Sequence, residues 1–509
     1  TEVVMQGGMR RGANMGILDA DHPDIFDFIR AKTEEGKLHN FNISVGTSDN
    51  FMRAVENDDY WDLLNPRSRD VVRTVRAREL FRLICEMAWK TGDPGMVFLD
   101  KLNKDNALAH LGAITSTNPC VSGDSLIHTV EGPKPARDLC GRKVDLLLNG
   151  KRVSSSEAGF FKTGEKPVFR LETREGFSIR LTEDHPILKV SRKTRYREDT
   201  EWVAAGQLKP GDRIKINDHR SWTDWEGFGT LEEGYVMGLL VGDGTIKKDK
   251  TVLSLWVPGA KAAGEENMGQ GSLAVMDEAL KAVQTLPHRS DFQGWIPVRG
   301  RNEYRMSTSA IGSLASYLGM SSGNKGITRK METDTSSAFV KGFLSGLFDA
   351  DGSVQGEQEK GISVRLSQSS LPTLQAVQRM LLRFGIASTI YKNRRKERSA
   401  LLPDGKGGMK AYQTLAQHEL VISRENIRLF SEKVGFRDSD KQGKLMGSLE
   451  HYRRNMNREY FIATVDLLVQ ECIEEVFDVI VPGENAFDAN GLVVHNCGEQ
   501  PLLPYEAVL

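Results

Sequence analysis

The string GLVVHNCGEQP fills residues 491–501, and the string TNPCVSGDS fills residues 117–125. Removal of residues 120–496 would join the flanks into one continuous motif, Asn118-Pro119-Cys497-Gly498-Glu499. The removable piece begins with Cys120, and Cys497 directly follows its end. The sequence therefore indicates one protein inserted into another, with nucleophiles at both junctions that could remove the insert.

The composition is that of a globular protein with room for about three domains. The chain has 509 residues, of which 39% are hydrophobic and 27% are charged, and no apolar run is long enough to cross a membrane. The start, Thr1-Glu2-Val3-Val4, has no signal-type stretch, and the missing methionine predicts a fragment. We therefore expect a cytoplasmic protein with no membrane partner.

Cysteine usage argues against a disulfide framework and against a zinc site. The five cysteines are an odd number, include no Cys-x-x-Cys pair, and lie at positions 85, 120, 140, 472 and 497. Free, reactive thiols are favoured instead.

Two kinds of sequence pattern, one typical of α/β structure and one typical of β-strands, alternate along the chain. The flank before Cys120 is of α/β type, with a strand predicted at 41–45 and a helix at 80–87 that ends at Thr91-Gly92. Short β-type runs separated by turns follow Cys120 up to an edge near residue 220, and similar runs return at 476–481 and 491–496. The sequence thus predicts an all-β module that is split by another domain.

The segment between the two β-type parts contains a repeated element. GLLVGDG at 238–244 and GLFDADG at 346–352 place Asp243 and Asp351 in equivalent positions, 108 residues apart, which indicates a domain-scale duplication. Residues 231–450 hold 30 Lys and Arg against 24 Asp and Glu. This mildly basic character is compatible with nucleic-acid binding.

The junction residues have the chemistry that excision needs. The Cys120 thiol can attack the carbonyl before it to form a thioester, and Thr182 and His185 offer a hydroxyl and an acid/base group. The Asn496 side chain can attack its own carbonyl and break the bond to Cys497, with His495 as proton donor. Each of these short motifs alone is also typical of an ordinary turn, but their joint occurrence favours the chemical interpretation.

These residues resemble the blocks of the Hint splicing domain of inteins. The resemblance covers 120–220 and 465–496, and its motifs are CVSGDS at 120–125, Thr182 to His185, and FDANGLVVHNC at 487–497. It implies an N–S acyl shift at Cys120, transfer of the flank to Cys497, cyclisation of Asn496 and no cofactor. It also implies that Asp478 tunes the cysteines, while Asn485 stands where many inteins carry histidine. A hedgehog-type autoprocessing domain is the alternative, but it would lack the His-Asn-Cys exit.

The repeated element resembles the LAGLIDADG motif of homing endonucleases, in which two helices pack through small residues and each delivers one acidic residue. The resemblance, over 221–464, implies that Asp243 and Asp351 bind Mg²⁺ and cut a double-stranded DNA target. Lys325 and Lys441 match its lysines near the scissile phosphates, with Lys330 and Lys444 as neighbours. Met237 replaces a small interface residue. The basic run 392–398 suits DNA contact or an ordinary solvated loop equally.

The flanks, 1–119 and 497–509, resemble a vitamin B12-dependent ribonucleotide reductase. The resemblance rests on GGMRRGANMG at 7–16, HPDI at 22–25, NFNISV at 40–45 and the rejoined Asn-Pro-Cys-Gly-Glu string. It implies that Cys497 carries a thiyl radical, that Asn118 binds the ribonucleotide substrate, that Glu499 is the general base, and that the complete enzyme uses adenosylcobalamin. A reductase with a non-splicing insert, a free-standing endonuclease, or an endonuclease that no longer cuts are the alternatives.

The expected architecture is therefore multidomain. We expect an all-β, horseshoe-like Hint splicing domain interrupted by an α/β LAGLIDADG endonuclease domain, with a partial α/β reductase barrel on the flanks. Pro119 is rigid and precedes the attacked bond, so we expect slow or condition-dependent splicing.

Overall fold

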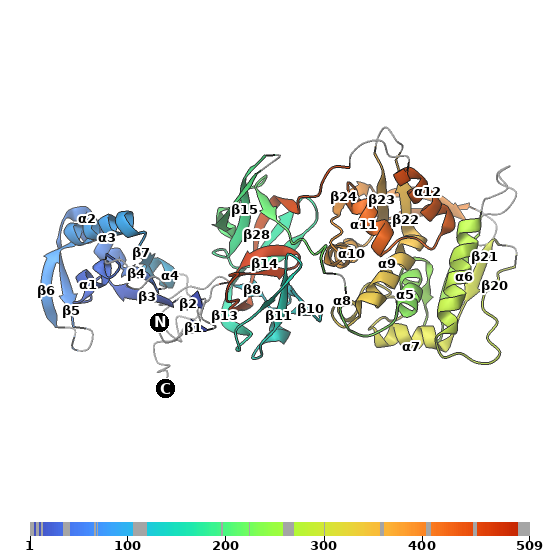
Figure 1. The fold of residues 1–509 in the computed structure, drawn as a ribbon, viewed down its shortest axis with the longest axis horizontal. Coiled ribbons are helices and arrows are strands. Elements are labelled where there is room, and N and C mark those ends of the chain that lie inside the picture. Colours follow the sequence, from blue (N-terminus) through green and yellow to red (C-terminus); the bar gives the residue numbers. More distant parts are fainter. Residues whose placement is uncertain are drawn as a thin grey trace.

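The computed structural model describes residues 5–6, 10–11, 14–33, 41–65, 68, 70–104, 120–194, 197–222, 224–257, 269–299, 301–356, 361–403, 409–450 and 456–496. Three bodies made of these residues follow one another along the long axis of the molecule (Figure 1). Among the described residues, no helix has both the length and the apolar character that a bilayer span requires.

The first body is a piece of parallel α/β structure. β3 (Asn14–Asp19) and β7 (Gly95–Phe98) each pair in parallel with β4 (Phe41–Thr47), the strand predicted from alternating apolar residues. Helix α3 (Ala77–Thr91) ends as predicted at Gly92, whose φ of 82° suits glycine. The other elements are β1 (Met5–Gln6), β2 (Arg10–Arg11), α1 (Ile25–Arg30), α2 (Asp49–Asn57), β5 (Tyr60–Leu64), β6 (Val71–Arg76) and α4 (Leu99–Lys104).

The second body, the β-body, is one sheet built from two distant parts of the chain. β28 (Ile462–Val479) pairs with β13 (Phe160–Thr173) and β17 (Arg213–Lys215), and β30 (Leu492–His495) pairs with β15 (Pro186–Lys193). The C-terminal strands therefore lie inside the sheet, which confirms the split β-module. The other strands are β8 (Val121–Ser122), β9 (Leu126–Thr129), β10 (Gly132–Pro135), β11 (Asp145–Leu148), β12 (Lys151–Ser154), β14 (Ser178–Leu181), β16 (Glu198–Ala204) and β29 (Ala486–Ala489).

The third body, the inserted domain, is a duplicated α/β unit. Each half starts with a long helix, α5 (Leu231–Asp243) or α9 (Ser337–Asp351), and continues into a four-stranded antiparallel sheet. In both sheets the first strand along the chain is followed by the second, then the fourth and then the third. These orders are β18-β19-β21-β20 and β22-β23-β27-β24. The predicted duplication therefore extends from the repeated motif to the topology of each half.

The remaining bounds of the inserted domain are as follows. Its strands are β18 (Thr245–Ile246), β19 (Thr251–Trp256), β20 (Ile296–Pro297), β21 (Glu303–Met306), β22 (Gly352–Gln355), β23 (Ser363–Gln368), β24 (Thr389–Arg395), β25 (Arg398–Pro403), β26 (Met409–Thr414) and β27 (Gln417–Ile422). Its helices are α6 (Gln270–Gln284), α7 (Ser309–Tyr317), α8 (Arg329–Thr333), α10 (Leu371–Arg383), α11 (Asn426–Lys433) and α12 (Ser439–Glu450).

Helices α5 and α9 pack against each other through glycines. A methyl group at Gly234, Gly238, Gly342 or Gly346 would collide with a backbone carbonyl oxygen of the facing helix, so only glycine permits this spacing. Met237 does not loosen the pair, because it is buried and the positions of closest approach are the glycines. Close packing of the two backbones brings the C-terminal ends of both helices together.

Candidate functional site

Cys120 lies at the start of the β-body and is fully buried. Its backbone N–H donates to Thr182 Oγ1 over 2.9 Å, and its carbonyl accepts the backbone N–H of Thr182 over 2.9 Å. Its Sγ lies 2.8 Å from Thr163 Oγ1 and 3.4 Å from Lys166 Nζ. Thr182 thus holds the backbone of this cysteine, whereas Thr163 and Lys166 contact its thiol.

The surroundings of Cys120 keep its thiol protonated. Burial raises the pKa of the thiol to about 12, the charge of Lys166 opposes the shift, and the charge of Asp478 adds to it. Asp478 is itself fully buried in β28, where its Oδ1 accepts the backbone N–H of Val479 over 2.7 Å. Attack by Cys120 therefore requires a group that removes the thiol proton.

His185 lies between the two junctions. Burial lowers the pKa of its imidazole to about 3, so the ring is neutral, and the backbone of both Cys120 and His495 lies close enough to oppose the shift. Neither ring nitrogen makes a hydrogen bond of good geometry to any residue that the structure describes. An unsatisfied buried polar group destabilises a fold, so these two nitrogens make His185 a candidate for acid/base chemistry.

Asn496 ends the described chain and is 2% exposed. Its backbone N–H donates to the carbonyl of Asn485 over 3.1 Å, and its side-chain Oδ1 has no partner among the described residues. Asn485, which stands where many Hint domains have histidine, therefore contacts the junction through its backbone. The ring of His495 packs edge-on against Trp202 at 4.8 Å, and burial lowers its pKa.

Thr163 and Lys166 were not found by the sequence analysis. Both belong to β13, which reaches Cys120 because it pairs with β28 and β14, the two strands that flank β8. No local motif marks them. Their proximity to the thiol comes from the order of the strands, which the sequence did not reveal.

Asp243 and Asp351 lie at the adjacent C-terminal ends of α5 and α9. Burial raises the pKa of both carboxyls, that of Asp351 to about 6, and the negative charge of Asp243 is the second cause of the shift at Asp351. Gln368, another residue that the sequence analysis missed, donates from Nε2 to Asp351 Oδ2 over 2.6 Å. Two neighbouring carboxylates offer the hard oxygen ligands that suit Mg²⁺.

Lys325 and Lys441 each bind the C-terminal end of one of these helices, at different positions of the repeat. Lys325 Nζ donates to the carbonyls of Gly242 and Gly244 over 2.7 and 2.9 Å. Lys441 Nζ donates to the carbonyls of Phe348 and Asp349 over 3.2 and 2.5 Å. Burial lowers the pKa of both ammonium groups, and the charges of Asp243 and Asp351 oppose this.

The neighbouring lysines lie elsewhere. Lys330 Nζ sits 3.5 Å over the ring of Tyr317, and Lys444 is exposed. The structure therefore brings Lys325 and Lys441, and not these neighbours, to the helix ends that carry the aspartates.

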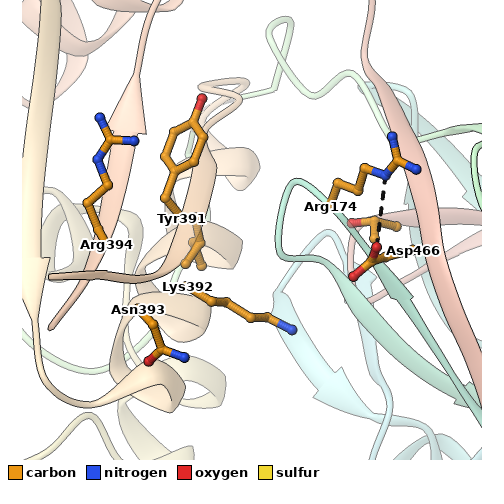
Figure 2. A pocket seen from close by; sticks show the side chains of 8 residues that line it. Arg174, Tyr391, Lys392, Asn393, Arg394 and Asp466 are labelled. Atoms are coloured by element: carbon orange, nitrogen blue, oxygen red, sulfur yellow. Dashed lines mark ion pairs between the residues drawn. The ribbon is translucent and has the colours of Figure 1, made fainter. Parts of the chain in front are cut away.

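The basic run at 392–398 borders a groove between the inserted domain and the β-body. The groove has a volume of about 470 Å³, and Figure 2 shows Lys392 and Arg394 on one side and the Arg174–Asp466 ion pair on the other. Residues up to Arg395 form strand β24, so the loop alternative is wrong for this part of the run. Lys392 Nζ lies 2.5 Å from Glu172, which ties the strand to the β-body.

The predicted host residues Asn118, Cys497 and Glu499 lie outside the described residues. Their assignment stays a prediction.

Comparisons with known proteins assign families to two parts of the chain. Residues 1–123 match the family model "Ribonucleotide reductase, barrel domain", and residues 338–435 match the "LAGLIDADG-like domain". A crystal structure of the Ssp DnaB mini-intein aligns with 75% of this chain and 97% of its own at 12% identity, with a TM-score of 0.23.

The curated relatives are reductases. The vitamin B12-dependent ribonucleoside-diphosphate reductase of Thermoplasma acidophilum is 54% identical over 121 residues, which are 24% of this chain and 16% of that protein. A Mycobacterium tuberculosis enzyme of the same name is 50% identical over 119 residues, 23% of this chain and 17% of that protein. The NrdEB subunit alpha of Bacillus subtilis is 26% identical over 551 residues, 97% of this chain and 49% of that protein.

The chain thus spans half or less of the length of these relatives. The reductase match ends just after Cys120, where the split β-module begins, and the LAGLIDADG-like match lies wholly inside the domain that splits this module. Residues 1–123 are therefore similar to a ribonucleotide reductase barrel domain, and the domain that splits the β-module contains a LAGLIDADG-like domain.

Proposed function

We propose that the chain is a self-splicing precursor. Cys120 Sγ attacks the Pro119 carbonyl carbon, the peptide C–N bond breaks, and the proton leaving the thiol ends on the freed amine. Cys497 Sγ then takes over the acyl group and releases the Cys120 thiol. Asn496 Nδ2 attacks its own carbonyl carbon, which breaks the bond to Cys497, and the freed amine of Cys497 converts the remaining thioester into a peptide bond.

The position of His185 is the observation that carries this proposal. The neutral imidazole of His185 lies near the backbone of both Cys120 and His495, and neither ring nitrogen has a hydrogen bond of good geometry among the described residues. A neutral ring can accept the thiol proton and deliver a proton to a leaving amine. The Thr182 hydroxyl, which accepts the Cys120 N–H, supports the first step because it contacts the nitrogen that must leave.

Intact-mass analysis of the expressed chain tests the splicing proposal. We expect a 377-residue product, residues 120–496, and a 132-residue product in which residues 1–119 are joined to 497–509. A chain that stays at 509 residues under reducing conditions while it remains folded would overturn the proposal. A reductase with a non-splicing insert predicts that outcome.

The inserted domain is proposed to be a homing endonuclease that uses Mg²⁺ to cut double-stranded DNA. Support comes from Asp243 and Asp351, whose carboxylates lie at the adjacent helix ends, where the charge of Asp243 adds to the raised pKa of Asp351. Paired carboxylates can hold metal ions that activate water and stabilise the leaving oxygen. The proposed target is the uninterrupted host gene. A plasmid with the joined reductase sequence should be linearised in Mg²⁺ and not in EDTA, and no cleavage at any salt concentration would contradict this.

After ligation, the host sequence is proposed to supply part of a B12-dependent ribonucleotide reductase in the cytoplasm. Asn118, Cys497 and Glu499 become neighbours only when the flanks join, so the precursor should not reduce nucleotides. Cys497 would serve twice, as acyl acceptor during splicing and as radical-bearing thiol afterwards. Support comes from the names of the relatives most similar to residues 1–123.

A further inference from the structure

A buried polar cluster joins three parts of the chain away from both proposed sites. It consists of His128 in β9, His219 after β17, and Asp488 in β29, each exposed by 2% or less. His219 Nε2 lies 2.7 Å from Asp488 Oδ2, and His128 Nδ1 lies 3.2 Å from His219 Nε2 and 3.4 Å from Asp488 Oδ2. These three atoms are close enough to surround a metal ion.

The proton positions in the cluster argue for hydrogen bonding instead of metal binding. The backbone N–H of Gly150 points at His219 Nδ1 over 3.3 Å, so this nitrogen presents its lone pair. In a neutral imidazole the other nitrogen then carries the proton, and Nε2–H donates to Asp488. A metal bound to His219 Nε2 would require the proton to sit on Nδ1. The N–H group at Nδ1 would then face the backbone N–H of Gly150, and the two would repel each other.

A buried cation from the inserted domain accompanies the cluster. Arg383, at the end of α10, is 2% exposed, stacks 3.7 Å over the ring of Trp225, and donates from Nη2 to the carbonyl of Thr129 over 3.1 Å. Burial lowers the pKa of its guanidinium, and the charge of Asp488 opposes this shift. Thr129 belongs to β9, which pairs with β29, so Arg383 contacts the strand beside the one that carries Asp488.

Asp488 connects this cluster to the C-terminal junction. Its Oδ1 accepts the backbone N–H of Gly491 over 2.7 Å, in the turn between β29 and β30. Gly491 has a φ of 89°, and a methyl group there would lie 2.6 Å from Leu382 of α10. Leu382 belongs to the hydrophobic core of the β-body. Helix α10 therefore supports the hairpin whose second strand ends at His495, next to Asn496.

We propose that Arg383 is a positioning residue through which the inserted domain holds the β29–β30 hairpin in place for cleavage at Asn496. This inference rests on the proposed splicing function. The first step should depend on it much less, because the hydrogen bonds that hold Cys120 come from Thr163, Thr182 and Lys166 of the β-body. The inserted domain thus contributes to the structure of the C-terminal junction.

The test uses the full chain and measures the two junctions separately. In Arg383→Met, we expect cleavage after Asn496 to slow by at least about tenfold, because α10 loses its hydrogen bond to Thr129 of β9, the strand that pairs with β29. Thioester formation at Cys120, read as fragments released by added thiol, should stay within about twofold of wild type. Arg383→Lys retains the charge and should restore most of the C-terminal cleavage.

Arg379→Met is the matched control. Arg379 lies one turn earlier on α10 and pairs with Glu332 of the inserted domain over 2.9 Å, so both junctions should react at wild-type rates. The inference would be overturned if Arg383→Met slowed both junctions equally or slowed neither. It would also be overturned if Arg383→Lys did not restore the rate of cleavage after Asn496. One zinc ion per purified chain that is lost in His128→Ala would also overturn it. Absence of processing in wild type would instead refute the splicing function itself.

Discussion

The proposed splicing site and the proposed nuclease site differ in the chemical groups that burial affects. In the β-body, burial acts on the single thiol of Cys120 and raises its pKa to about 12, so the nucleophile stays protonated. In the inserted domain, burial acts on two like charges, and the pKa of Asp351 rises to about 6 partly because Asp243 is near. The buried thiol therefore needs a base that removes its proton, whereas the carboxylate pair favours the binding of a cation.

The two sites also differ in how they are assembled. The proposed splicing site joins residues from the two parts of the split β-module through strand pairing, and it exists in one copy. The nuclease site joins two copies of one motif through glycine-mediated helix packing, with one lysine at each helix end. The sites share no residue, so substitutions should disable one activity and leave the other.

Substitution of the thiol has the largest expected effect. Cys120→Ala should abolish the 132-residue ligated product, because no thioester can form at the first junction. The plasmid-cutting activity of this variant should be that of wild type. Mass spectrometry and a plasmid assay on the same preparation measure both. Cys472→Ala, which removes an exposed cysteine from β28, is the control and should splice normally. Ligated product from Cys120→Ala would remove the proposed role of this residue.

Substitution of either proposed nuclease aspartate tests whether DNA cleavage can be lost while splicing continues. Asp243→Asn or Asp351→Asn should lower DNA cleavage by at least about 100-fold, since each removes a charged metal ligand. Splicing should continue at the wild-type rate. Asp277→Asn, on the exposed face of α6, serves as the control. If either aspartate variant still cuts DNA at the wild-type rate, the shared site is wrong.

The pH dependence of the first splicing step tests the raised pKa of Cys120. When His185 is absent, the first step depends on the thiolate fraction, which grows with pH up to the pKa. In Asn496→Ala with His185→Ala, the rate of thioester formation should therefore rise about tenfold per pH unit. No plateau should occur below about pH 10. Thiol-induced cleavage between pH 6 and pH 9 measures this. A plateau near pH 8.5 would mean that the thiol ionises like an exposed cysteine.

Helix packing gives the smallest expected effect. Gly238→Ala should destabilise the inserted domain by about 1–3 kcal/mol, because the new methyl group collides with the carbonyl of Phe343. Gly443→Ala in α12 meets nothing within 4 Å and should instead stabilise it by about 0.5–1 kcal/mol. Urea titration followed by circular dichroism distinguishes the two signs. Equal effects would mean that the α5–α9 contact is looser than described.

Much of the fold followed from local patterns. The period-two alternation at 41–45 predicted β4, the apolar spacing at 80–87 predicted α3, and the Asn149-Gly150 pair joins β11 to β12 with both residues at positive φ. These patterns concern neighbours along the chain, where the geometry of the backbone fixes the period. The duplicated motif similarly indicated two equivalent halves.

The residues that complete the sites were less accessible. Thr163, Lys166 and Gln368 carry no motif. Thr163 and Lys166 reach Cys120 because β13 pairs with strands far along the chain, whereas Gln368 reaches Asp351 through the pairing of β23 with its neighbour β22. Arg383 lies at the end of an amphipathic helix whose sequence does not distinguish a buried arginine from an exposed one.

By itself, the sequence determined which atoms can react at the junctions and which two aspartates correspond, because reactive neighbours and repeats are written in local order. Only the tertiary structure decided that His185 lies near the backbone of Cys120 and His495, that Lys325 and Lys441 bind the helix ends, and that Arg383 is buried and donates to Thr129. These facts depend on strand order and on contacts between residues far apart in the chain, 83 positions for Lys325 and Gly242 and 254 for Arg383 and Thr129, which no local period encodes.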